Sequence, residues 1–367
     1  MLQSSGSRKP WCITVEQISR STSAGTENPL EFTSNTHDHT AKSLGPEHLM
    51  VGSGSDEVIS SLILCFCRPG RDKMLICPPT YGMYGVSACV NDVGVVHVPL
   101  DAYNGFRLRP EAVNKALSSN PSIKIVYICS PGNPTAACIA KEDIQRVLEH
   151  PTWNGVVVID EAYIDFALDG SSLAEWVLEF QNLVVMQTLS KAWGLAGIRV
   201  GAAFTSAPIA KLLNSLKAPY NISSPSSALA CAALRPENFA IMKESRRKIM
   251  QQRDRILQEL PKIPGIGAFR GGIDANFVLV EILDKPRDSG GRPSNEVALA
   301  LYNLLAEGKG IVVRFRGKDF GCRGCLRVTV GTPDEVDRLL EGMKAVLGEL
   351  LDQGVDRVKD KLGEAQA

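Results

Sequence analysis

The segment LVVMQTLSKAWGLAGIRVG runs from Leu183 to Gly201. Its first residues are apolar and largely β-branched, which predicts a buried strand. Lys191 follows the end of that strand, and ligands in α/β sheets bind beyond the carboxyl ends of the strands. A lysine at such a position is partly desolvated, loses its proton more easily than in water, and can form a Schiff base with an aldehyde.

Thr188, Ser190 and Arg199 lie near this lysine in the sequence. They suit a phosphate group, because hydroxyls and guanidiniums both donate hydrogen bonds to phosphate oxygens. The segment therefore predicts an anchor for a phosphorylated aldehyde cofactor, pyridoxal phosphate. Taken alone, it also allows a second interpretation, a strand-to-helix turn in which Ser190 caps the helix and Lys191 lies in solvent.

The composition limits what this segment can mean. A chain of 367 residues is long enough for two packed domains, and its 44% hydrophobic and 22% charged residues are ordinary for a soluble globular protein. Its 40 basic residues balance its 40 acidic residues, which favours a small substrate over nucleic acid or a membrane surface. No apolar run reaches the ~20 residues of a membrane span, and the N-terminus lacks a secretory signal, so we expect a cytoplasmic protein.

The cysteines are predicted to be reduced. Six of the ten lie in or beside apolar runs, as small core residues do: Cys65, Cys67, Cys77, Cys89, Cys129 and Cys138. The one Cys-x-x-Cys, Cys322 to Cys325, has no second pair at zinc-finger spacing. His37 and His39 lie in a segment that resembles a solvated loop, and we predict no metal site.

A glycine-rich turn at Gly52 and Gly54 precedes an apolar run after Glu57, which predicts a buried helix that ends before Pro69. Such a turn, feeding a helix N-terminus, offers free backbone N–H groups to an anion. The motif lacks the Gly-Lys-Ser/Thr of a nucleotide-binding loop, so the anion need not be a nucleotide. Gly-Ser-Asp before a helix is also an ordinary capping sequence.

Two further predicted strands lead into polar residues. One precedes Asn133, and the other ends at Asp160 with Tyr163 just beyond it. Right-handed parallel crossovers would bring these strand ends and Lys191 into one crevice. The chemistry suits a pyridoxal ring, because Asp160 can hold a pyridine nitrogen protonated, Asn133 and Tyr163 can bond the phenolate oxygen, and Lys191 can take the aldehyde carbon.

The C-terminal half is predicted to form a smaller domain after a long charged helix. The helix covers residues 237–259, and the domain contains strands over 276–282, 310–314 and 326–330 and helices over 297–305 and 333–351. We expect an arm over residues 1–45, a large domain over 46–260 and a small domain over 261–367. Arg327 lies within an apolar strand, so it needs an anionic partner, either an internal carboxylate or a ligand.

Seven motifs keep one order between about residues 45 and 350: Gly54–Glu57, Pro79–Tyr84, Ser130–Thr135, Asp160–Tyr163, Leu189–Lys191, Ala196–Arg199 and Leu326–Thr332. With them the sequence resembles the fold-type-I pyridoxal-phosphate aminotransferases, and within those the class II histidinol-phosphate aminotransferase family. The resemblance implies an α/β fold, with a mostly parallel sheet between helices in the large domain and a smaller α+β C-terminal domain. It also implies a homodimer.

The resemblance implies roles for individual residues. It assigns five to the cofactor phosphate, the first two through their backbone: Ser55, Asp56, Thr188, Ser190 and Arg199. It makes Tyr81 a stacking platform for the cofactor ring, which suits a tyrosine held stiffly after two prolines. The alternative is that Tyr81 and Tyr84 are ordinary half-buried aromatics. Arg314 and Arg327 become ligands of the substrate's anionic group, and Asn133, Asp160, Tyr163 and Lys191 keep the roles argued above.

The implied reaction is transamination of histidinol phosphate with 2-oxoglutarate, giving imidazole-acetol phosphate and glutamate in histidine biosynthesis. Lys191 would be the general acid and base. Three alternatives remain open. They are an aminotransferase for other substrates such as aromatic amino acids, a phosphate-substrate decarboxylase, and a catalytically impaired structural relative.

The N-terminus departs from the family. Related enzymes carry an arm with an Asn-Glu-Asn-Pro-like motif, followed by an Asn-Arg-Tyr-Pro segment whose tyrosine reaches the cofactor phosphate of the neighbouring subunit. Here Thr26–Leu30 is similar to the first motif but lies too close to Gly54, and the first tyrosine of the chain is Tyr81. We therefore expect residues 1–34 to be a replaced or truncated segment, and one inter-subunit phosphate contact to be missing.

Overall fold

Apolar strands alternating with helices build a seven-stranded sheet of order β1-β7-β6-β5-β4-β2-β3 in the computed structural model, which describes residues 44–356. All strands except β7 run in the same direction. The strands are β1 (Leu49–Gly52), β2 (Lys73–Ile76), β3 (Gly94–His97), β4 (Ile123–Cys129), β5 (Val156–Asp160), β6 (Leu183–Thr188) and β7 (Gly201–Thr205). This confirms the predicted mostly parallel sheet. The arm predicted for residues 1–45 lies outside the described residues except for its last two.

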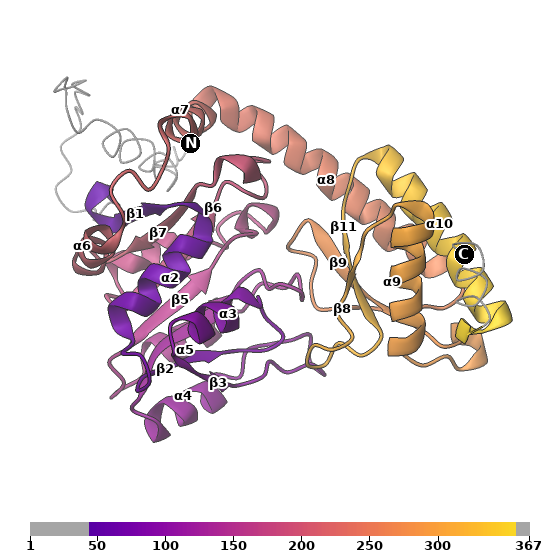
Figure 1. Cartoon of the computed structure of the whole chain (residues 1–367), viewed down its shortest axis with the longest axis horizontal. Helices are drawn as coiled ribbons and strands as arrows, with labels where there is room; N and C mark the ends of the chain where they lie inside the picture. The colour runs from indigo at the N-terminus through magenta and orange to yellow at the C-terminus, as the bar shows by residue number, and fades with distance from the viewer. Residues whose placement is uncertain (1–43, 357–367) are drawn as a thin grey trace, which may run out of the picture.

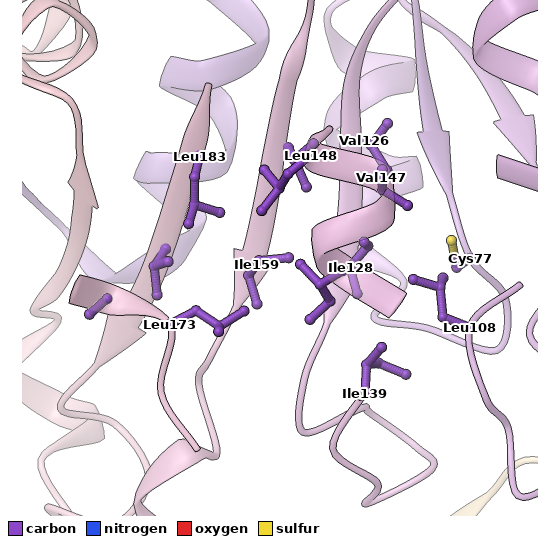
Figure 2. Packing of buried hydrophobic residues seen from close by; sticks show 14 of the residues in the cluster. Cys77, Leu108, Val126, Ile128, Ile139, Val147, Leu148, Ile159, Leu173 and Leu183 are labelled. Atoms are coloured by element: carbon purple, nitrogen blue, oxygen red, sulfur yellow. The ribbon is translucent and has the colours of Figure 1, made fainter. Parts of the chain in front are cut away.

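Helices cover both faces of this sheet, because its central strands are apolar on both sides. In β5, Val157 and Ile159 pack into one cluster and Val156 and Val158 into the other. Figure 2 shows the first cluster, where Ile128 of β4 and Ile159 of β5 face Val147 and Leu148 of a covering helix. That face carries α4 (Pro110–Ser119) and α5 (Lys141–Leu148), and the other carries α2 (Gly54–Phe66), α3 (Met83–Val90) and α6 (Ala207–Leu216).

The predictions missed the two strands at one edge of the sheet. β1 has only four residues, and β7, Gly-Ala-Ala-Phe-Thr, is rich in glycine and alanine, which have weak strand propensity. They form because β7 pairs antiparallel with both β6 and β1. The helix predicted after Glu57 begins three residues earlier, at Gly54.

A second sheet, of order β10-β11-β9-β8, is antiparallel throughout. It consists of β8 (Ile266–Arg270), β9 (Phe277–Ile282), β10 (Arg314–Phe315) and β11 (Cys325–Thr329). Figure 1 shows the long helix α8 (Phe239–Glu259) running from the large sheet towards it, with α9 (Asn295–Lys309) and α10 (Pro333–Gln353) covering one side. We propose the domain boundary near residue 260, just after α8 ends.

Two details of this region differ from the predictions. β8 was not predicted. The strand predicted over residues 310–314 is wrong, because only Arg314 and Phe315 pair with β11. Gly310 is instead the left-handed cap of α9, at φ 63°, and Ile311 N donates to Leu305 O at 2.9 Å, so these residues complete the helix.

The small sheet presents its other side to the large domain. Val278 and Val280 of β9 pack under the helices, whereas Leu279 joins a cluster of the large domain and Phe277 packs with Tyr163. This alternation follows from the two-residue period of a strand. It is what brings side chains from both sheets to one place.

The predictions for the cysteines were partly correct. All cysteines within residues 44–356 are free thiols, and Cys322 and Cys325 are buried. Cys89 is exposed, so its predicted core position is wrong. Between residues 44 and 356 no helix is long and apolar enough to cross a bilayer. His37 and His39 lie outside the described residues.

Candidate active site

The predicted site residues of the large domain gather at the carboxyl ends of the parallel strands. Asp160 is the last residue of β5, Lys191 follows β6, and Asn133 follows β4. These three strands are parallel neighbours in the sheet, as predicted. Residues 189–193 form turns and no helix begins there, so Ser190 does not cap a helix. The helix cap of the alternative interpretation is therefore wrong, whereas the exposed position that it gives Lys191 agrees with the structure.

Asp160 is a buried carboxylate with two hydrogen-bond donors. The Tyr84 hydroxyl donates to Oδ2 at 2.6 Å, and the backbone N of Ala162 donates to Oδ1 at 3.1 Å. Burial raises the pKa of Asp160, and the bond from Tyr84 acts in the opposite direction. These two bonds hold the carboxylate in one orientation. A positively charged or proton-donating partner would stabilise its buried negative charge.

Lys191 lies above the Tyr163 ring, with Nζ 5.3 Å from the ring centroid. Desolvation lowers the pKa of Lys191, and the positive charge of Arg327 lowers it further, while Asp160 opposes both. A lysine with a lowered pKa has a larger neutral fraction, and the neutral amine is the form that attacks an aldehyde or accepts a proton.

A cradle for an anion forms where the first turn of α2 meets the start of β7. A Cβ added to Gly201 would lie 2.5 Å from Ser55 N, so only glycine allows this approach. Gly54 has φ 75°, and a Cβ there would meet Arg199 Nη2. Arg199 Nη2 also donates to Asp56 Oδ2 at 3.1 Å. Backbone N–H groups and a guanidinium thus converge at a helix N-terminus.

The two hydroxyls predicted for the phosphate differ in their surroundings. Thr188 is buried, and its Oγ1 lies 3.2 Å from Val200 O and 3.0 Å from Ser190 Oγ. Ser190 is only partly buried. Ser190 is therefore the more accessible of the two, and Thr188 supports the turn that carries it.

Tyr81 stands beside this cradle. Its hydroxyl donates to Asp56 Oδ1 at 3.3 Å, and its ring meets the Tyr84 ring edge-on at 5.6 Å between centroids. Burial, followed by the charge of Asp56, raises the pKa of Tyr81 to about 12, so it is neutral at physiological pH. Tyr84, in contrast to the half-buried aromatic considered above, is fully buried.

The small sheet supplies positive charge. Arg327 of β11 reaches across to the large domain, and its Nη1 donates to Asn133 Oδ1 at 2.7 Å. Its guanidinium carbon lies 4.9 Å from the centroid of the Phe277 ring. Burial, then the neighbouring Arg316 and Arg314, lower the pKa of Arg327. No carboxylate within residues 44–356 forms an ion pair with Arg327, so the internal partner considered above is absent from the described part.

These residues fit pyridoxal phosphate. They include an amine of lowered pKa, a buried carboxylate for a ring nitrogen, and a glycine-shaped cradle that a Cβ would fill. A family model for class I and II aminotransferases matches residues 25–343. The chain is also 53% identical over 308 residues to the histidinol-phosphate aminotransferase of Schizosaccharomyces pombe, covering 84% of this chain and 79% of that protein. The chain belongs to the histidinol-phosphate aminotransferase family.

Other relatives agree. The histidinol-phosphate aminotransferase of Saccharomyces cerevisiae is 43% identical over 320 residues, which are 86% of this chain and 80% of that protein. Among solved structures, the enzyme of that name from Clostridium acetobutylicum superposes with a TM-score of 0.72 at 24% identity, covering 92% of this chain and 90% of that one. The enzyme from Sinorhizobium meliloti, in complex with pyridoxal-5'-phosphate, gives 0.71 at 22% identity, over 83% and 78%. These two likenesses confirm the fold-type-I architecture.

Two residues of this histidinol-phosphate aminotransferase site were not singled out from the sequence. They are Tyr84, which bonds Asp160, and Arg316, whose Nη2 donates to Asn133 Oδ1 at 3.2 Å. Tyr84 lies within a motif of the family, but only its hydrogen bond to Asp160, which the sequence does not show, distinguishes it from an ordinary core tyrosine. Arg316 lies just after the end of β10, and no pattern in the sequence marks it as a site residue. The expected loss of an inter-subunit contact concerns residues 1–34, outside the described residues.

Proposed function

We propose that the chain catalyses the pyridoxal-phosphate-dependent transamination of histidinol phosphate with 2-oxoglutarate, giving imidazole-acetol phosphate and glutamate, in histidine biosynthesis. The observation that carries the proposal is the partly buried cation Arg327, which lies close enough to Lys191 to lower its pKa and has no carboxylate partner in the described part of the chain. A cation in that position suits an anionic substrate. Identities of 53%, 49% and 43% to yeast histidinol-phosphate aminotransferases support the choice of substrate.

Pyridoxal phosphate, when bound, supplies an aldehyde carbon that takes up amino groups and a ring that withdraws electrons from the reacting carbon. The cradle formed by Ser55, Asp56 and Arg199, together with Ser190 and Thr188, would hold its phosphate. Asp160 would hold the ring nitrogen, and Asn133 and Tyr163 would bond the phenolate oxygen. Tyr81 would stack on the ring.

Lys191 performs the proton transfers in this proposal. Its Nζ would hold the aldehyde group of the cofactor, and would be freed when the amino group of a substrate replaces it. The neutral Nζ would then accept the proton from the substrate carbon and would donate it again later in the reaction, as a general base and then a general acid. The lowered pKa of Lys191 serves both steps, because each requires the neutral amine first.

Arg327 and Arg314 would bind the anionic end of each substrate in turn. Arg314 and Arg327 are directly opposite each other on β10 and β11 and therefore share one side of the sheet. A guanidinium can donate two parallel hydrogen bonds to either a phosphate or a carboxylate. One site can thus receive histidinol phosphate and then 2-oxoglutarate.

The proposed test follows the two half-reactions separately. Purified protein saturated with pyridoxal phosphate is mixed with histidinol phosphate, glutamate or aromatic amino acids, and the cofactor spectrum and the products are recorded. We expect conversion with histidinol phosphate and glutamate and no release of carbon dioxide. Preference for an aromatic amino acid, release of carbon dioxide, or no reaction at all would each contradict the proposed substrate or activity.

The role of Lys191 has its own test. Borohydride reduction of the cofactor-saturated protein, followed by peptide mapping, should find the pyridoxyl group on Lys191. A different modified lysine would refute this assignment.

We also propose that the protein is a cytoplasmic homodimer, as the family resemblance implies. Light scattering should give twice the mass of the chain, and tagged protein should be found in the cytoplasm. A monomer with full activity would refute the dimer.

A further inference from the structure

Three arginines crowd one side of the small sheet. Arg314 pairs with Arg327, and Arg316 extends the same ladder, since its backbone N donates to Cys325 O at 2.9 Å. Arg314 is directly opposite Arg327 and so shares its side of the sheet, and Arg316 reaches the same Asn133 oxygen as Arg327. The charges of Arg316 and Arg314 both contribute to lowering the pKa of Arg327, after burial. Like charges repel, so this arrangement is costly until an anion joins it.

The three arginines are not equivalent. Arg314 is exposed and makes no hydrogen bond or ion pair with any residue from 44 to 356. Arg316 is only 24% exposed and points to the large domain, where its Nη2 donates to Asn133 Oδ1 at 3.2 Å. Arg327 donates to the same oxygen at 2.7 Å. Two cations therefore meet at one neutral amide oxygen.

The protein leaves this pair of cations incompletely satisfied. Asp319 forms an ion pair with Arg316, with Oδ2 3.3 Å from Nε, but no hydrogen bond joins the two atoms. The ion pair balances one of the two cations and leaves Arg327 without a carboxylate in the described part of the chain. The Nε atoms of Arg316 and Arg327 are both buried and donate to no acceptor in the described part of the chain. A buried donor without a partner costs free energy, and an anionic ligand would supply one.

We propose that Arg316 joins Arg327 as a ligand of the substrate phosphate and makes the site favour a phosphate over a carboxylate. The assignment rests on the proposed function. A phosphate monoester carries about −1.5 to −2 charges at pH 7 and three acceptor oxygens, which match two guanidiniums. The side-chain carboxylate of glutamate carries one charge and two oxygens, which one bidentate arginine satisfies. Arg316 therefore contributes more to the binding of histidinol phosphate than to the binding of glutamate.

The test compares both half-reactions in Arg316→Gln. We expect kcat/KM for histidinol phosphate to fall at least about tenfold further than kcat/KM for glutamate, since a charge-assisted hydrogen bond is lost from one substrate only. Most of the change should appear in KM. Inorganic phosphate should also compete less well with glutamate in the variant than in the unmodified protein, and pyridoxal phosphate should bind with similar affinity.

Arg323→Gln is the matched control. Arg323 lies in the same connection between β10 and β11, is exposed, and donates from Nε to Pro293 O at 3.2 Å. The control removes the same charge without touching the cluster, and should not separate the two substrates. Arg316→Lys keeps the charge but loses the fork of donors, so it should show a smaller loss of the same kind. It decides the question if Arg316→Gln does not fold.

Three results would overturn the assignment. Equal losses with both substrates, or weaker cofactor binding alone, would mean that Arg316 only orients Asn133. No turnover of histidinol phosphate by the unmodified chain would refute the proposed function as well. Turnover by the unmodified chain with equal losses in the variant would refute the role of Arg316 alone.

Discussion

At the scale of single residues, the Tyr84 hydroxyl orients the Asp160 carboxylate and lowers its pKa. Tyr84→Phe removes the bond of 2.6 Å to Oδ2. The pKa of Asp160, already raised by burial, should rise further, because that bond lowers it. The carboxylate should then hold the cofactor ring less well, and we expect affinity for pyridoxal phosphate to fall about tenfold in a spectroscopic titration.

Tyr127→Phe provides the comparison for this variant. The Tyr127 ring stacks on Tyr84 with centroids 4.7 Å apart, but its hydroxyl donates to Ile59 O at 3.3 Å, away from Asp160. The Tyr127→Phe variant should therefore keep its affinity for pyridoxal phosphate. Equal affinities for Tyr84→Phe and the unmodified protein would show that the backbone N of Ala162 orients Asp160 without help.

Glu161, the next residue, gives a pH dependence of stability. It is 2% exposed, and burial raises its pKa to about 7 against the opposing bonds from Ser172, Leu173 and Gln187. The native state keeps the proton that the unfolded chain releases near its ordinary pKa of 4.5, so the free energy of unfolding should fall as pH rises from 4.5 to about 7. The fall is about 3 kcal/mol at most.

Glu161→Gln should abolish this contribution. Urea unfolding at pH 5.5 and pH 8 measures it, and the unmodified protein should lose more stability between the two than the variant does. Parallel losses in both proteins would mean that Glu161 is ionised throughout this range.

At the scale of elements, the bend between β8 and β9 holds the loop that carries Asn133. Gly272 N donates to Thr135 O at 2.9 Å, and Gly271 has φ 75° with its missing Cβ only 2.0 Å from the same oxygen. Gly271→Ala should therefore lower the free energy of unfolding by about 2–4 kcal/mol, from backbone strain and from the clash together. Asn133 should shift, and cofactor affinity should fall.

Gly290→Ala separates the two causes. Gly290 also has φ 75°, but nothing lies within 4 Å of the position of its Cβ. Its substitution should cost only the strain, about 1 kcal/mol. Urea unfolding of both variants gives the difference, and equal losses would mean that the loop adapts to a side chain at Gly271.

At the scale of the whole molecule, the site is shared by the two sheets, so cofactor binding should stabilise both. Pyridoxal phosphate at 100 times its Kd should raise the free energy of unfolding by about 2.7 kcal/mol. Lys191→Ala should reduce this gain but keep the part contributed by the phosphate cradle. Thermal unfolding with and without cofactor measures it. An unchanged Tm in cofactor-saturated unmodified protein would contradict binding at this site.

The sequence by itself determined the elements that carry the chemistry. Continuous apolar runs specify the strands before Asn133, Asp160 and Lys191, and parallel neighbours must end at one edge of a sheet. Gly52 and Gly54 indicated a tight turn that leads into a helix N-terminus. These signals are local, since propensity, turn chemistry and periodicity act over a few residues, and they were sufficient for the fold class and most of the candidate site.

The tertiary structure alone decided which side chains meet. Asn133 and Arg327 are 194 residues apart, and Tyr84 and Asp160 are 76 apart, so no local pattern relates them. The antiparallel strand β7, weak in propensity, forms only because its neighbours offer unpaired backbone groups. The inward position of Arg316 likewise depends on the register of β10 with β11 and on how the small sheet packs against the large one. Packing brings residues together that are distant in the sequence, and it therefore decides whether a buried charge has a partner.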